Sequence, residues 1–371
     1  MLPTIATGNV ASALAGEYEV ANSLRFNSGS SDYLEKTQTG SNGDLKKWTL
    51  SMWVKRAKLG TAQELFSFGE NNSAGGKLSF DSNDFLVLNN DYQNGGTNET
   101  DMKFRDVSAF YHIIWACDVT QSDNADRWKV YVNGNQVTLT GSPSISNADG
   151  VINRWSGFDN WIGGNARVQQ SGNPANYSDV YFAEVVFIDG TQLDQNSFGE
   201  FDTDSPTIWK PKDVSGLTFG TNGYYLDFEN ASSLGADVSG NSNNFTANNL
   251  TSIDQSTDTC TNNFATINSL ENYYTPHTLS EGNLKQTTAN SNLYAPSIST
   301  IALSQGKWYF ECKYVSRSTS DNYNLIGVKS TQVTNTNYLG QNQHDYGYYS
   351  SSGKYYTNGS AVNYGDSYDQ G

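Results

Sequence analysis

The side chains best suited to catalysis are few and scattered in this chain of 371 residues. Its three histidines, His112, His277 and His344, lie far apart, and no Ser/His/Asp or Cys/His set follows from their spacing. His112 falls between apolar neighbours, where a histidine is usually a hydrogen-bonded core or edge residue rather than a ligand. Glu184 stands alone in an apolar segment, and no glycine-rich loop opens a helix. We therefore expect no catalytic residues and no nucleotide site.

Aromatic side chains next to short polar ones offer a different chemistry. Aromatic residues make up 13% of the chain, and 23 of them are tyrosines. An exposed ring can stack on the C–H face of a sugar, while neighbouring Asn, Asp and Gln side chains bind its hydroxyls. The candidate carbohydrate-binding residues are Trp53, Trp155, Trp161, Tyr348 and Tyr356. The alternative is that these rings pack under a covering segment or in a subunit interface, and for Trp53 both alternatives stay open.

Two alternating segments, residues 110–119 and 127–137, indicate the elements that position these side chains. In each, side chains of one kind recur with a period of two, as in a half-buried strand. Asn133-Gly134 follows the second run at once, and this pair favours a type I′ turn with positive φ at both residues. Several other short alternating segments are bounded by Gly, Asn or Ser clusters. The pattern predicts an all-β protein with an antiparallel sandwich or barrel.

The residue pattern divides the chain into four segments. Residues 1–22 read as an N-terminal attachment arm, and residues 23–230 as a sandwich whose final part, 189–230, wraps over it as a tail. Residues 231–305 are rich in Asn, Ser and Thr and are expected to be an irregular connector, because such a composition buries little apolar area. Alternation returns in residues 306–371, which predicts a partial second sandwich.

Composition and charge exclude several functional classes. The net charge of −16 argues against binding to nucleic acid or to an anionic membrane. The N-terminal residues lack the pattern of a secretory signal, and no run of 18 apolar residues predicts membrane insertion. Three widely spaced cysteines predict neither a disulfide framework nor a zinc site, and Cys117 is expected to be a buried small apolar residue.

The order of several of these segments resembles a known family. WTLSMWVKR, ELFSFGE, FYHIIWACDVT, DRWKVYVNGNQV, NWIGGNA and YFAEVVFIDGTQL, within residues 23–230, resemble the laminin-G-like (concanavalin-A-like) domains of virion proteins from marine tailed bacteriophages. The resemblance implies a jelly-roll sandwich. GKWYFECKYV, NLIGV and DYGYYSSSGKYYTNG resemble the first half of a SPRY domain, which would continue with further strands, so a longer natural protein is expected.

These resemblances imply a virion surface protein, a fibre or fibre-like appendage on the tail or capsid exterior. It would contact other virion proteins through residues 1–22, assemble with itself as a trimer, and adhere to host-surface polysaccharide without turnover. It would be made in the host cytoplasm without a signal peptide. The alternatives are a capsid-decorating or tail structural protein and, less favoured, a polysaccharide hydrolase.

The resemblance also has implications for metal and acid chemistry. Laminin-G-like domains often hold Ca²⁺ near the rim of the sandwich, which makes Asp118, Asp123, Asn124 and Asp126 candidate ligands, because Ca²⁺ prefers such oxygen donors. The alternative is ordinary turn chemistry, in which these side chains bond their own backbone. Jelly-roll glycoside hydrolases place two carboxylates across the sugar on a Glu-x-Asp-x-x-Glu strand. No such run occurs here, so we expect a protein without enzymatic activity.

Overall fold

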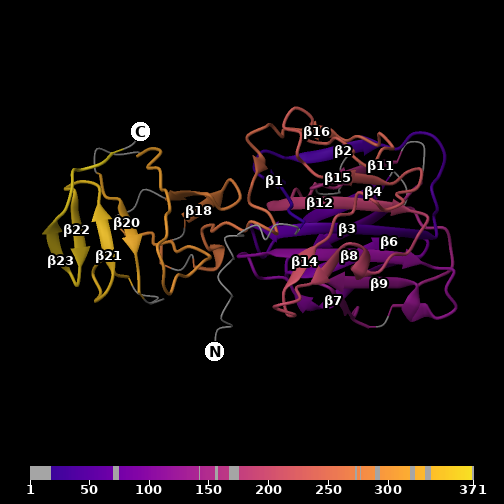
Figure 1. Cartoon of the computed structure of the whole chain (residues 1–371), viewed down its shortest axis with the longest axis horizontal. Coiled ribbons are helices and arrows are strands. Elements are labelled where there is room, and N and C mark those ends of the chain that lie inside the picture. Colours follow the sequence, from indigo (N-terminus) through magenta and orange to yellow (C-terminus); the bar gives the residue numbers. More distant parts are fainter. Residues whose placement is uncertain are drawn as a thin grey trace. The chain divides into compact units, whose positions relative to one another are not determined.

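The computed structural model of the chain consists of strands, loops and three short 3₁₀ turns over the residues that it describes (Figure 1). These are residues 18–69, 75–141, 143–154, 158–166, 175–271, 274–275, 277–288, 293–317, 322–330 and 336–369, without the side chains of 95–97. The chain divides into two compact units. The first comprises the described residues up to Thr266 together with Ser280–Leu284, and the second comprises Ile267–Leu279 and the residues from Lys285 onward.

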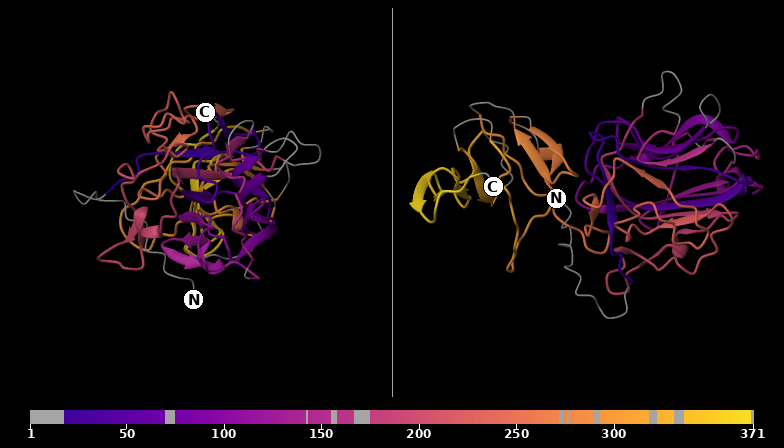
Figure 2. Two further views of the ribbon diagram at one scale, coloured as in Figure 1. Left: turned by 90° about the vertical axis from the view of Figure 1, so that its right-hand side faces the viewer. Right: turned by 90° about the horizontal axis from the view of Figure 1, so that it is seen from above.

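The first unit contains two large antiparallel sheets, which Figure 2 shows from two further directions. One sheet has the order β10-β9-β8-β3-β12-β1-β17, with β15 also paired to β12. Its strands are β1 (Ser23–Phe26), β3 (Lys47–Arg56), β8 (Phe110–Asp118), β9 (Trp128–Val132), β10 (Asn135–Val137), β12 (Val180–Asp189), β15 (Tyr224–Leu226) and β17 (Gln255–Ser256). We call it the first sheet.

The second sheet has the order β16-β2-β11-β4-β5-β6-β7. Its strands are β2 (Tyr33–Thr37), β4 (Gln63–Gly69), β5 (Gly75–Phe80), β6 (Phe85–Asn90), β7 (Asn94–Lys103), β11 (Asp159–Ile162) and β16 (Thr246–Asn248). Strand β7 was not expected, because its sequence NGGTNETDMK is polar and does not alternate. Its extended conformation is stabilised by the hydrogen-bonded pairing with β6, because its sequence has no alternation of apolar and polar side chains.

The core of the first unit lies between these two sheets. Trp48 and Trp115 of the first sheet meet edge to face, with ring centroids 4.8 Å apart. They share one buried cluster with Phe66, Phe68 and Leu78 of the second sheet. Burial of each such side chain stabilises the fold by about 1.5–3 kcal/mol. The predicted antiparallel β-sandwich is confirmed, and Cys117 is a buried member of the same cluster.

The turn between β9 and β10 has the predicted geometry. Asn133 and Gly134 have φ values of 47° and 78°, both in the left-handed region that a type I′ turn requires. A Cβ atom on Gly134 would lie 2.2 Å from the ring of Trp209. Position 134 therefore requires glycine for two reasons: the positive φ of the backbone and the close approach of the Trp209 ring.

A covering segment lies on the outer face of the first sheet, whereas Tyr224–Leu226, also within the predicted tail 189–230, join that sheet as β15. It contains η2 (Gln195–Ser197), β13 (Gly199–Phe201) and β14 (Trp209–Pro211). Phe198, Val214 and Phe219 of this segment pack in one cluster with Ile114 and Ile188 of the sheet. Both faces of the central strands β3, β8 and β12 are therefore buried, which differs from the usual sandwich with one solvated face.

Residues 231–266 form part of the first unit instead of an irregular connector. β16 and β17 extend the two sheets, and Phe245 and Leu250 enter the main core cluster. The Lys55 ammonium, only 1% exposed, donates to Asp258 Oδ2 at 2.9 Å and to the Phe264 carbonyl at 2.7 Å. Sequence composition did not reveal this docking because it depends on single long-range contacts rather than on an apolar pattern.

The second unit carries a hairpin and a four-stranded sheet. The hairpin joins β18 (His277–Ser280) to β19 (Lys285–Thr288), and η3 (Ser269–Glu271) precedes it. The sheet, drawn in yellow tones in Figure 1, has the order β20 (Leu325–Val328), β21 (Tyr346–Tyr349), β22 (Lys354–Thr357) and β23 (Ser360–Asn363). We call it the tyrosine sheet.

Residues 306–317 were expected to begin this second unit with a strand, and that expectation is wrong. They carry no regular secondary structure, and Tyr309, Phe310 and Val315 are 83%, 57% and 58% exposed. Alternation alone does not make a strand, because a neighbouring strand must take up its backbone hydrogen bonds.

Among the described residues, no helix is long and apolar enough to cross a membrane.

Candidate functional site

Glu184 lies at a bulge in β12, between the register positions Ala183 and Val186. Its φ of 48° turns the side chain under the covering segment, where the residue is 4% exposed. The Glu184 Oε2 atom accepts hydrogen bonds from the hydroxyls of Tyr225 at 2.7 Å and Tyr18 at 2.9 Å. Burial raises the pKa of Glu184 to about 7, although the two tyrosine hydrogen bonds act in the opposite direction.

His112 lies on β8 and is also enclosed, with 1% of its surface exposed. Its Nδ1 accepts a hydrogen bond from Trp209 Nε1 at 2.8 Å, so Nε2 carries the proton and faces Ser51 Oγ at 2.8 Å. The imidazole stacks on Trp53, with ring centroids 4.5 Å apart. Burial lowers the pKa of His112 to about 3, which keeps the ring neutral. The prediction of a hydrogen-bonded core histidine is confirmed.

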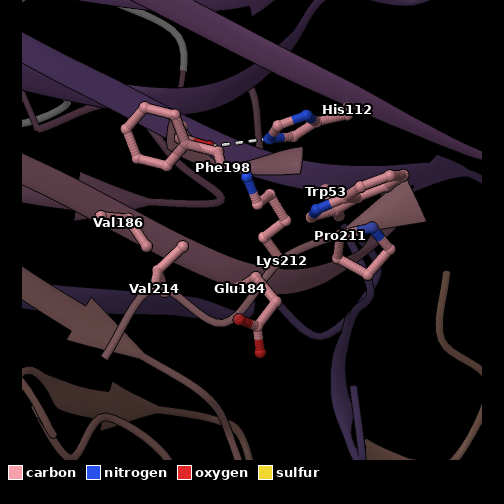
Figure 3. A pocket seen from close by; sticks show the side chains of 9 residues that line it. Trp53, His112, Glu184, Val186, Phe198, Pro211, Lys212 and Val214 are labelled. Carbon is pink, nitrogen blue, oxygen red and sulfur yellow. Dashed lines mark hydrogen bonds between the residues drawn. The ribbon is translucent and has the colours of Figure 1, made fainter. Parts of the chain in front are cut away.

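A small cavity lies beside these two residues, and Figure 3 shows its lining, with the Glu184 carboxylate pointing away from His112. Ser51, Trp53, Phe198 and Val214 complete much of the wall, and the cavity leaves no room for a water molecule. A general acid must reach its substrate within hydrogen-bond distance, directly or through one water. In this structure His112 holds Trp209 of the covering segment, and Glu184 holds Tyr18 and Tyr225.

The structure buries two of the tryptophans that were candidates for carbohydrate binding. For Trp53 the structure shows the alternative of burial under a covering segment, because the ring is 4% exposed and packs in one cluster with Trp209. Trp161 is 3% exposed, and it stacks on Tyr33 at 3.9 Å and donates to Glu35 at 3.1 Å. Neither ring is open to a ligand in this conformation. Trp155 lies outside the described residues.

The candidate calcium ligands do not converge. Asp118 Oδ1 accepts from the Thr120 backbone and hydroxyl, and Asp123 caps η1 (Asn124–Asp126) through the Ala125 amide. Asn124 bonds the backbone of residues 143 and 145, and Asp126 pairs with Lys129 at 3.0 Å. No group of three or more acidic, histidine or cysteine side chains able to hold a metal occurs in the described part of the chain. Ca²⁺ binding by this loop stays a prediction of the sequence.

The tyrosine sheet presents an aromatic surface that is partly open to solvent. The strand register places Tyr348 opposite Tyr355, and Tyr355 opposite Val362, on one face of the sheet. Tyr346 lies two residues before Tyr348 and therefore shares this face. Tyr364 follows β23 and contacts both Tyr348 and Tyr355, with ring centroids 5.3 and 5.7 Å apart. We call Tyr346, Tyr348, Tyr355 and Tyr364 the tyrosine face.

The exposure of these rings increases toward the ends of the row. Tyr346 is 47% exposed and Tyr364 is 73% exposed, while Tyr348 and Tyr355 are intermediate. Tyr348 donates its hydroxyl to the backbone carbonyl of Asp366, which fixes its orientation. The rings thus form a continuous surface with two open ends. Of the predicted residues, Tyr348 belongs to this face.

Tyr356, the other candidate in this unit, lies on the opposite face. Its register partner is Gly347, and its ring contacts Tyr349 and Tyr338 at 5.7 Å each. Sequence reasoning missed Tyr364 as a member of the tyrosine face. The signal was available, because Val362 and Tyr364 continue the alternation that begins at Ser360.

Comparisons with known proteins are weak. No family model matches the sequence, and no curated protein matches it. A proposed carbohydrate binding protein from Bacteroides ovatus is 14% identical, with a TM-score of 0.44 over 62% of this chain and 59% of that protein. A heptameric SAP-like pentraxin from Limulus polyphemus is 14% identical, with a TM-score of 0.34 over 48% of this chain and 80% of the pentraxin. The CBM40 of Ruminococcus gnavus IT-sialidase is 15% identical, with a TM-score of 0.30 over 44% of this chain and 94% of that module.

Proposed function

We propose that this chain is a non-catalytic glycan-binding protein that adheres through the tyrosine face. The observation that carries the proposal is the row of four tyrosine rings on one side of a sheet, with exposed rings at both ends. The face of each ring is electronegative and attracts the electropositive C–H groups of a sugar. The phenolic hydroxyls at the ring edges can both donate and accept hydrogen bonds to sugar hydroxyls. A row of rings suits an extended chain of sugars better than a single one.

The source that the sequence resemblance suggests is the surface of a tailed-bacteriophage virion, on a fibre or fibre-like appendage. In this proposal residues 1–22 contact other virion proteins, the chain assembles as a trimer, and the ligand is a host-surface polysaccharide. The net charge of −16 is compatible with a hydrated exterior surface. The described end of the arm supports only a local role, since Tyr18 and Val20 pack against the first unit.

Adhesion without turnover agrees with the state of the acidic side chains. Glu184, the acid at the bulge of β12, is closed off by Tyr18 and Tyr225. Hydrolysis of a glycosidic bond by Glu184 would need its carboxylate and a second one to flank an accessible sugar. A reducing-sugar assay on host polysaccharide tests this point. Turnover that is lost in Glu184→Gln would overturn the non-enzymatic proposal.

A structural role on the capsid or tail is the second candidate, and one observation favours it. Trp308, Tyr309 and Phe310 are 46%, 83% and 57% exposed in a segment without secondary structure. Contiguous exposed apolar side chains commonly mark a protein–protein interface. In this alternative the tyrosine face and this segment would contact neighbouring subunits instead of sugars.

An array of bacterial lipopolysaccharides and capsular polysaccharides, probed with the full chain, tests the glycan proposal. The array is probed with about 2 mM CaCl₂ and again with a chelator, because the sequence predicts a Ca²⁺ site that could contribute to sugar binding. Binding to a defined subset of polysaccharides is expected. Failure to bind any polysaccharide under either condition, together with self-association through residues 306–317, would favour the structural role.

A further inference from the structure

The first unit carries a surface depression of about 320 Å³ where β9 meets the chain around η2. Its lining residues are Lys129, Tyr131, Gln192, Leu193, Asp194 and Ser197, and we call it the β9–η2 depression. Its volume lies at the lower end of the range for small-molecule sites, about 300–1,000 Å³. Nothing in the sequence pattern singled it out, because its two sides come from segments about 60 residues apart.

The floor of the β9–η2 depression is closely packed against the first sheet. Tyr131 and Lys129 lie on the same face of β9, where they pair with Ile114 and Ala116 of β8. The Tyr131 ring is 7% exposed and packs in the cluster that contains Phe198. Its hydroxyl has no hydrogen-bond partner among the described residues, and it is not one of the fully buried polar atoms. A fixed ring therefore presents an unused donor and acceptor toward the depression.

The wall adds two further polar side chains, Gln192 and Ser197, each with an atom that is available for a hydrogen bond to a ligand. Gln192 Nε2 donates to the carbonyls of Asp126 at 2.9 Å and Arg127 at 3.3 Å, which fixes the orientation of the amide. The Gln192 Oε1 atom accepts no hydrogen bond from the described residues, and the Ser197 hydroxyl has no partner among them. A ligand that carries several hydroxyl groups can satisfy these three positions at once. Leu193 supplies an apolar contact on the same wall.

The charges around the β9–η2 depression select among such ligands. Lys129 is paired with Asp126 at 3.0 Å, and Asp194 is an additional exposed carboxylate. One cation therefore faces two carboxylates, in a chain whose net charge is −16. An anionic sugar would be repelled by this arrangement, while a neutral or positively charged one would not.

We propose that the β9–η2 depression is a binding site for one neutral or amino sugar ring, separate from the tyrosine face. Tyr131 and Ser197 exchange hydrogen bonds with its hydroxyls, Gln192 accepts one more, and Asp194 receives a hydroxyl or ammonium group. The choice of a sugar among polyhydroxylated ligands rests on the proposed glycan function. The location of the site rests on the geometry of the depression alone.

Saturation-transfer NMR with the full chain tests the proposal, with methyl glucoside, glucosamine and glucuronate as the three probes. We expect binding of the first two and weaker binding of glucuronate. Tyr131→Phe and Ser197→Ala should each weaken binding by roughly threefold to tenfold, the effect of one lost hydrogen bond. Asp194→Asn, which can still cap η2, should reduce the discrimination against glucuronate. Circular dichroism checks that each variant is folded.

Tyr364→Ala, on the tyrosine face, separates this proposal from the proposed function. Loss of transfer in Tyr131→Phe but not in Tyr364→Ala supports the site in the β9–η2 depression. Loss in Tyr364→Ala alone overturns this site and leaves the proposed function intact. Absence of transfer from all three probes, or transfer that neither Tyr131→Phe nor Ser197→Ala changes, also overturns it.

Discussion

Replacement of Glu184 by Gln should change how the stability of the first unit depends on pH. The buried carboxyl has its pKa raised from 4.5 to about 7. The folded state therefore holds a proton that the unfolded state has released, over the whole interval between these values. By linkage, the contribution of Glu184 to stability is fully present below pH 4.5 and is lost as the pH rises to about 7. Gln keeps an acceptor oxygen for Tyr18 and Tyr225 but does not ionise.

The magnitude follows from the width of this interval. At about 1.4 kcal/mol per pH unit, the interval from 4.5 to about 7 corresponds to about 3 kcal/mol as an upper value. His112 acts in the opposite direction, since its pKa is lowered from 6.5 to about 3 and its contribution to stability is lost as the pH falls through that range. Between pH 4.5 and 6.5 the two residues compensate each other. In Glu184→Gln, the free energy of unfolding should therefore rise with pH in this range, because only the contribution of His112 remains.

Urea unfolding of both proteins at pH 4 to 8, followed by tryptophan fluorescence, measures the difference. Trp308 is the single tryptophan that follows Thr266, so the signal reports mainly on the first unit. The free energy of unfolding of Glu184→Gln, minus that of the unchanged chain, should rise by up to about 3 kcal/mol between pH 4.5 and 7. Asp204→Asn, at an exposed acid between β13 and β14 that does not contribute to the pKa of Glu184, is the control and should show no such rise. A difference that is constant across this range would refute the reasoning.

Three further comparisons test the fold. Lys55→Met leaves the buried Asp258 without its cation and should lower the free energy of unfolding by about 3–5 kcal/mol. The double variant Lys55→Met with Asp258→Leu should recover part of this loss. If urea unfolding gave the same loss for the single and the double variant, that would contradict the pairing. Gly134→Ala should destabilise more than Gly141→Ala, because both glycines have positive φ but only Gly134 lies against Trp209; equal shifts in melting temperature would argue against this contact. Trp53→Ala should cost about 3–5 kcal/mol as a core residue and leave polysaccharide affinity unchanged, so a folded variant with lost affinity would restore Trp53 as a ligand residue.

Local patterns predicted the elements whose cause is local. The Asn133-Gly134 turn and the alternating segments of β3, β8 and β12 were predictable, because strand period and turn chemistry are properties of neighbouring residues. Burial of Trp53 was not, because alternation gives the face on which a side chain lies but not what covers that face. The prediction that residues 189–230 wrap over the sandwich came from Pro206 and Pro211, which cannot lie in central strands, yet the contact of Trp209 with His112 depends on the three-dimensional path of the segment.

The candidate site was less predictable than the fold. Tyrosine clusters near the C-terminal end of the sequence indicated an aromatic surface, but the face shared by Tyr348, Tyr355 and Tyr364 depends on the registers of β21, β22 and β23. The same register separates Tyr356 from them. The loop of Asp118 and Asp126 has the composition of an oxygen-rich site, and its side chains are used by turns and an ion pair instead.

The most direct test of the central claim compares two tyrosines with equal exposure. Tyr364 on the tyrosine face and Tyr323 are each 73% exposed, and Tyr323 stacks on Tyr349, which faces the other side of the sheet. The measurement is the affinity of each alanine variant for a polysaccharide that the unchanged chain binds. We predict about a tenfold loss for Tyr364→Ala, the value of one aromatic contact, and no loss for Tyr323→Ala. Equal affinities of the two variants would contradict binding at the tyrosine face.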